Sequence, residues 1–173
     1  INATVYKENG GVVVIEAEHF DTRTVNTDGH RWAIMPDENG NPDSAADAGF
    51  ANARGNKYMQ SLPDSAGGGS NFNTPDQVCT DPHLDFKVQI SNPGRYRLYI
   101  RWGGYDGSSD SMYAQIVEFK SPSGPGPDWY RFIGTTTDFD ARNWDGSGAH
   151  STDTVNNVNA GGGEVTAVWN ITA

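Results

Sequence analysis

The sequence predicts an all-β protein in which two antiparallel sheets pack face to face as a β-sandwich with long loops. Short segments of alternating apolar and polar residues recur along the 173-residue chain, as strands with one buried face require. Turn sequences separate these segments, and the chain contains 21 glycines and 9 prolines. No segment shows convincing helical periodicity, so a parallel sheet with helical crossovers is not expected.

Each expected strand is bounded by a turn sequence. The Glu-Asn-Gly sequence at residues 8–10 suits a hairpin turn between the first two strands. Residues 63–77 are rich in glycine, serine and asparagine, and we expect a long loop there. The expected strands cover residues 3–7, 11–20, 56–62, 84–90, 95–102, 112–119, 129–136 and 164–171.

The clearest alternation is that of residues 84–90, Leu-Asp-Phe-Lys-Val-Gln-Ile, in which every second residue is apolar. Residues 95–102, Arg-Tyr-Arg-Leu-Tyr-Ile-Arg-Trp, alternate in the same way, and Ser-Asn-Pro-Gly between the two segments is a turn signal. We therefore expect the two segments to pair as an antiparallel hairpin. Trp102 and Trp169 fall in strand patterns and are expected in the core.

We expect residues 1–173 to form one domain, because strand patterns resume on both sides of each glycine-rich loop. The net charge of −10 makes nucleic acid and anionic membrane surfaces poor partners. No apolar run is long enough to suggest a membrane-spanning helix. The single cysteine, Cys79, cannot form an internal disulfide.

Residues 12–21, Val-Val-Val-Ile-Glu-Ala-Glu-His-Phe-Asp, combine an apolar run with two carboxylates. The apolar run is expected to be buried on both faces of a strand. Glu16 and Glu18, two positions apart, would share one face of that strand, where their charges repel and burial is costly. A calcium ion would neutralise the pair. The alternatives are exposure to water or pairing with an arginine. The available arginines are Arg54, Arg97 and Arg101.

Several aromatic residues fall among turn residues and are candidates for sugar contact. A pyranose presents a face of C–H groups that stacks on an aromatic ring, and its hydroxyls need polar partners. Residues 142–145, Arg-Asn-Trp-Asp, supply both kinds of group, and residues 30–32, His-Arg-Trp, nearly do so. Packing at the end of the sandwich is the alternative for each tryptophan. The candidate sugar-binding residues are Trp32, Asn143, Trp144, Tyr105 and Trp129.

The motifs at residues 11–20 (GVVVIEAEHF), 56–62 (NKYMQSL) and 84–102 occur in an order that resembles the carbohydrate-binding modules of families six and thirty-five. These modules and their galactose-binding-like relatives are jelly rolls of two antiparallel sheets. The resemblance implies a structural calcium ion with Glu16 and Glu18 among its ligands, and sugar binding on loops between the sheets. The chain departs from these relatives at Ala-Val-Trp-Asn-Ile-Thr-Ala, residues 167–173, where we expect their closing strands to be absent, diverged or supplied elsewhere.

We therefore expect a non-catalytic carbohydrate-binding module of a secreted, extracellular bacterial enzyme that degrades polysaccharide. Its partners would be a polysaccharide or oligosaccharide and the catalytic domain of the same chain. The alternative is a structural accessory domain that packs on a catalytic domain and binds no sugar. Catalysis by the chain is not expected. Glycosidase carboxylates normally come from separate strands flanking a cleft, and no serine-hydrolase or zinc-protease motif occurs.

Overall fold

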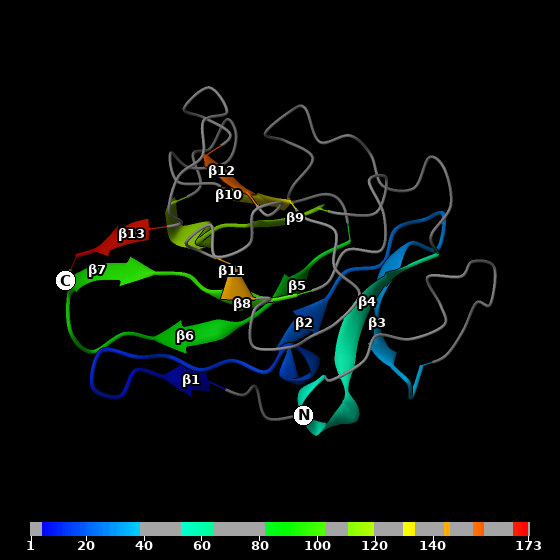
Figure 1. Ribbon diagram of the computed structural model, residues 1–173, viewed down its shortest axis with the longest axis horizontal. Helices are drawn as coiled ribbons and strands as arrows, with labels where there is room; N and C mark the ends of the chain where they lie inside the picture. The colour runs from blue at the N-terminus through cyan, green and yellow to red at the C-terminus, as the bar shows by residue number, and fades with distance from the viewer. Residues whose placement is uncertain are drawn as a thin grey trace.

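The computed structural model describes residues 5–38, 53–63, 82–102, 111–119, 130–133, 144–145, 154–157 and 168–172. In these residues the chain is built from short β-strands and single-turn 3-10 helices (Figure 1), which confirms the all-β fold class. The finer prediction of a two-sheet jelly-roll sandwich stays a prediction, because the described strands pair in several small sheets. None of the described helices is long and apolar enough to span a membrane.

Eight short elements are described in the first part of the chain, up to residue 89. They are β1 (Val5–Lys7), η1 (Ala17–His19), β2 (Thr22–Arg23), β3 (Arg31–Met35), η3 (Arg54–Asn56), β4 (Tyr58–Leu62), β5 (Leu84–Asp85) and β6 (Lys87–Gln89). The elements of the second half are β7 (Gly94–Arg97), β8 (Ile100–Arg101), β9 (Ser111–Ala114), η5 (Val117–Phe119), β10 (Tyr130–Ile133), β11 (Trp144–Asp145), β12 (Thr154–Asn157) and β13 (Val168–Ile171).

Strands that are distant in the sequence lie side by side in the fold. β1 pairs with β6 in parallel, and every other described pair is antiparallel. The antiparallel pairs are β2–β5, β3–β4, β7–β13, β8–β11 and the three-stranded sheet β12–β10–β9. The last strand, β13, thus returns to lie beside β7, as Figure 1 shows at the C-terminal end.

The predicted hairpin between residues 84–90 and 95–102 is wrong. Each segment is divided into two short strands, and all four pair elsewhere: β5 with β2, β6 with β1, β7 with β13 and β8 with β11. Alternation of apolar residues determines which face of a strand is buried. It does not determine which strand lies along each edge, so the partners depend on contacts between distant parts of the chain.

The predicted turn after β1 is present, one residue further along than expected. Gly10 and Gly11 have φ values of 62° and 85°, the left-handed conformation that a two-residue hairpin turn requires and glycine adopts without strain. Asn9 and Val12 form an antiparallel bridge across it. One oxygen of the Glu8 carboxylate accepts a hydrogen bond from Gly11 N at 2.5 Å, and this bond, as the largest cause, holds the pKa of Glu8 below its ordinary value.

The main hydrophobic core is formed by residues of β8, β9, β10 and β13 and by residues next to these strands. The prediction that Trp102 and Trp169 are core residues is confirmed, since they are 3% and 5% exposed. Tyr130 packs edge-on against Trp169 with ring centroids 5.1 Å apart, and its hydroxyl donates a 2.8 Å hydrogen bond to Val168 O. A smaller cluster of Ala33, Met35 and Leu62 lies between β3 and β4.

Phe132 in β10 is fully buried in the main core. We expect Phe132→Ala to lower the free energy of unfolding by about 3–5 kcal/mol, because the substitution removes apolar contact and leaves a cavity. Urea unfolding of both proteins measures the difference. The control is Val117→Ala in η5, at an exposed position, for which we expect a change within about 0.5 kcal/mol. Equal effects of the two substitutions would contradict the assignment of this core.

Candidate functional site

Trp32 lies in a strand, which corrects the prediction that it belongs to a loop. It is in β3, directly opposite Ser61 of β4. Ala33 and Met35 of β3 are buried on one face of this ribbon, and by alternation Trp32 and Ile34 point to the other face, where both are half-buried. The sequence Arg-Trp-Ala-Ile-Met lacks clean alternation, which is why its strand was not predicted.

The indole ring of Trp32 is anchored by its polar edge. Its Nε1 donates a 3.0 Å hydrogen bond to the carbonyl oxygen of Pro82, which comes shortly before β5. Because an indole has one N–H donor, this bond satisfies the polar requirement of the ring. What the partly exposed indole can still offer to a ligand is therefore apolar ring surface.

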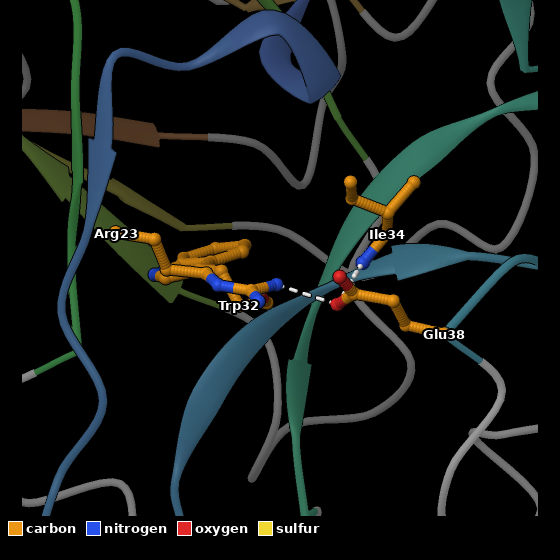
Figure 2. Close-up of polar contacts among 4 residues, drawn as sticks. All are labelled: Arg23, Trp32, Ile34 and Glu38. Carbon is orange, nitrogen blue, oxygen red and sulfur yellow. Dashed lines mark hydrogen bonds and ion pairs between the residues drawn. The ribbon is translucent and has the colours of Figure 1, made fainter. Parts of the chain in front are cut away.

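Arg23 of β2 and Glu38, in the turn after β3, form an ion pair beside Trp32 (Figure 2). Nη1 of Arg23 donates to Glu38 Oε2 at 2.5 Å and to the carbonyl oxygen of Trp32 at 2.8 Å. The same Glu38 oxygen accepts a 3.1 Å hydrogen bond from Ile34 N, and Glu38 N donates to Ile34 O. One guanidinium nitrogen and one carboxylate oxygen thus join β2, β3 and the following turn.

These bonds fall on one edge of β3. In a strand, the main-chain groups of residues two apart point in the same direction. Trp32 and Ile34 use theirs for Arg23 and Glu38, so this edge faces away from β4. Among the described strands β3 pairs only with β4. The Arg23–Glu38 pair therefore satisfies main-chain groups that a further strand would otherwise satisfy.

The environment of Glu38 favours its charged form. The hydrogen bond from Arg23 is the largest cause that holds the pKa of Glu38 below its ordinary value of 4.5. Partial burial acts in the opposite direction, whereas the Ile34 amide and the charges of Arg23 and Arg31 lower the pKa further. The ion pair is therefore intact at neutral pH.

A second polar group lies on the β2–β5 ribbon. Thr22 Oγ1 donates to Asp85 Oδ2 at 2.5 Å, and Thr24 Oγ1 lies 3.1 Å from His83 Nε2. Arg23 lies between the two threonines in the sequence, so by alternation these groups point away from the Arg23 side chain. They are separate from the group of Trp32, Arg23 and Glu38, which we call the Trp32 site. Their position on a shared face was not predicted, because residues 21–56 show only polar and turn composition.

Glu16 and Glu18 do not lie in a strand, which corrects the premise of the shared carboxylate face. Residues 13–16 belong to none of the described strands, and residues 17–19 form the 3-10 helix η1. Glu16 Oε1 pairs with Arg54 Nη1 at 3.1 Å, which is the arginine alternative raised by the sequence. The Tyr6 hydroxyl donates to the carbonyl oxygens of Glu16 and His19, at 3.3 Å and 3.0 Å. Burial, followed by the charges of Glu18 and Glu16, raises the pKa of Tyr6.

The oxygen atoms around Glu16 are thus engaged by an arginine and a tyrosine hydroxyl. Within the described ranges, no group of three or more acidic, histidine or cysteine side chains could hold a metal ion. Calcium at Glu16 and Glu18 stays a prediction that rests on the family resemblance.

Three of the four residues in the apolar run before Glu16 are exposed, contrary to expectation, and Val13 is half-buried. Val12 and Val14 are 58% and 64% exposed, and Ile15 is also exposed. Burial of residues 12–15 is predicted because four consecutive β-branched residues are typical of a strand that is buried on both faces. Of residues 12–15, only Val12 has a bridge partner among the described residues, namely Asn9. In the described part of the chain, therefore, no sheet encloses residues 13–15.

The side chains of the remaining candidates for sugar contact lie outside the described residues. Trp144 contributes its main chain to β11, where it pairs with Arg101 of β8, but its side chain lies outside the described residues. Asn143, Tyr105 and Trp129 also lie outside them. Of the candidates, Trp32 alone has its side chain described, and the sequence did not identify its partners Arg23 and Glu38.

Comparison with known proteins gives one partial similarity. No family model matches the chain, and no solved structure matches it. An uncharacterized protein of Formosa agariphila is 30% identical over 114 residues, an alignment that covers 56% of this chain and 25% of that protein. The chain therefore spans about a quarter of the length of the curated relative that it matches.

The Glu38 pKa predicts how stability depends on pH. A carboxyl whose folded pKa lies below its unfolded value adds stability above about pH 4.5, and this stability is lost as pH falls through the folded pKa. We expect Glu38→Gln to be less stable than the wild type at pH 7 and the difference to shrink towards pH 3. Urea unfolding across this range measures it, with Glu118→Gln at an exposed position as the control. A difference that stays constant with pH would contradict the charged pair.

Proposed function

We propose that this chain is a non-catalytic carbohydrate-binding module that holds a secreted polysaccharide-degrading enzyme on its glycan. The main support for the proposal is the set of contacts that Trp32 makes. Its half-buried indole is fixed in orientation by Pro82, and Arg23 and Glu38 lie beside it. An indole with its N–H already bonded suits stacking against the C–H face of a pyranose, which asks for no polar partner from the ring.

Arg23 supplies polar groups that such a ligand needs. A guanidinium has five N–H donors, and the hydrogen bonds of Arg23 to Trp32 and Glu38 both use Nη1. In the described part of the chain its Nε and Nη2 donors remain for ligand hydroxyls, and the side chain is 22% exposed. An aromatic face and an adjacent rigid donor form a minimal sugar subsite.

The proposal places the chain within a larger protein. The similar protein of Formosa agariphila extends well beyond the matched region, since the alignment covers 25% of it. This is in keeping with a module that accompanies a catalytic domain. The proposed partners are a polysaccharide or oligosaccharide and that catalytic domain, and the proposed location is extracellular.

Binding to polysaccharide tests the function directly. Affinity electrophoresis in gels containing xylan, galactan, laminarin or alginate detects retardation of the 173-residue chain. We expect retardation by at least one glycan, a loss of about tenfold or more in affinity for Trp32→Ala, and a smaller loss for Trp32→Phe, which retains an aromatic face. Tyr99→Ala, which removes an exposed aromatic residue outside the site, should bind like the wild type.

Binding that Trp32→Ala leaves unchanged would contradict Trp32 as the sugar-contact residue. The absence of binding by a wild-type chain whose circular dichroism and cooperative unfolding show that it is folded would contradict the function itself.

Structural calcium at Glu16 and Glu18 is a further part of the proposal, and its support is the family resemblance. An ion bound only by the folded state adds stability in proportion to the logarithm of its concentration. We therefore expect EDTA to lower the melting temperature of the wild type, added calcium to restore it, and Glu16→Gln to remove the response. Arg54→Gln, which breaks the ion pair with Glu16, should retain the response to calcium. An unchanged melting temperature in EDTA would contradict calcium binding.

The exposed apolar run favours the second candidate, a structural accessory domain that binds no sugar. Val12, Val14 and Ile15 are exposed within four positions of the chain, and exposed apolar residues that form a contiguous patch are typical of contact with another protein surface. In this role the run would pack on a neighbouring domain. A folded chain that none of the glycans retards would favour this candidate over the first.

A further inference from the structure

Trp32 is held by two ribbons at once. Its main chain belongs to the β3–β4 ribbon. Its ring is bonded to Pro82, which lies next to the residues that extend the β2–β5 ribbon through the hydrogen bond from Thr24 N to His83 O. The direction of the ring therefore depends on how these two ribbons are placed relative to each other.

Arg23 and Glu38 connect the same two ribbons. Arg23 extends from β2 to the edge of β3 that faces away from β4, and Glu38 takes the next position along that edge by accepting from Ile34 N. Figure 2 shows the guanidinium and the carboxylate directed towards each other beside this strand. Arginine suits this role better than lysine, because its planar group directs donors to two acceptors in fixed geometry.

We propose that Arg23 and Glu38 are the positioning residues of the Trp32 site, which set the orientation of the indole by aligning the β2–β5 and β3–β4 ribbons. This inference rests on the proposed function for its consequence in binding, but the orientation itself can be measured without a ligand. The ion pair acts through the main chain of β3 and through the ribbon that carries Pro82.

The burial of the pair supports a structural effect. Surface ion pairs contribute little because water screens them and their side chains are mobile. The side chains of Arg23 and Glu38 are 22% and 34% exposed and also bond to main-chain groups. The neighbouring pair of Asp37 and Lys57 is more exposed, at 52% and 46%. Asp37 adjoins Glu38 in the same turn, so it provides a matched control.

The test uses fluorine NMR of the 173-residue chain labelled with 5-fluorotryptophan. The chain has five tryptophans, and comparison with Trp32→Phe identifies the Trp32 resonance. We expect that resonance to shift and broaden in Arg23→Gln and in Glu38→Gln, while the resonance of the core residue Trp169 stays in place. Arg23→Lys should restore part of the wild-type signal. Asp37→Asn and Lys57→Gln should leave the spectrum unchanged.

Affinity for the polysaccharide that retards the wild type most strongly gives the second readout. We expect a loss of about tenfold in Arg23→Gln and in Glu38→Gln, and no further loss in the double variant, because both substitutions break one unit. A Trp32 resonance that both substitutions leave unchanged would overturn the proposal. Weaker binding with an unchanged resonance would also overturn it, since Arg23 would then act by touching the sugar. If the wild type binds none of the glycans, the proposed function fails, and the resonance alone decides the positioning role.

Discussion

The site depends on how the main-chain groups of β3 are satisfied along the edge that faces away from β4. A strand edge presents main-chain donors and acceptors that must be satisfied where they are removed from water. Here the ion pair of Arg23 and Glu38 satisfies two of them, at Trp32 and Ile34. This side-chain solution leaves the strand partly accessible, whereas a further strand would cover its edge. An aromatic residue on β3 can therefore be both rigid and partly exposed.

The same constraint explains why Trp32 suits stacking better than polar recognition. Its main chain is fixed by Arg23, and its only ring donor is used by Pro82. Ligand binding would cost little conformational entropy in this side chain, because the structure has already ordered it. In the proposed subsite its neighbours supply the polar contacts, since the hydrogen bonds of Arg23 to other described residues use only Nη1. Rigid aromatic surface beside a fixed guanidinium is the physical basis of the proposed subsite.

Local patterns in the sequence predicted the fold class and part of the core. Alternation identified β4, β10 and β13 as strand regions, and it placed Trp102 and Trp169 inside. The partners of the strands were not predictable, because residues 84–102 pair with four different strands, from Val5–Lys7 to Val168–Ile171. The prediction that Glu16 and Glu18 share one face was wrong because a two-residue spacing implies a shared face only in a strand. The chain forms a 3-10 helix at Ala17–His19 instead. The contact between Arg23 and Glu38 could not be predicted, because the two residues are fifteen positions apart in a polar segment and belong to no sequence motif.

The response of the Trp32 ring to sugar tests directly whether this residue contacts the ligand. It is measured by titrating the 5-fluorotryptophan-labelled chain with oligosaccharides prepared from the polysaccharide that the chain binds. We expect the Trp32 resonance to shift saturably with sugar concentration, while those of the buried Trp102 and Trp169 do not move. Saturable binding with an unmoved Trp32 resonance would show that the sugar lies elsewhere and would contradict stacking on Trp32.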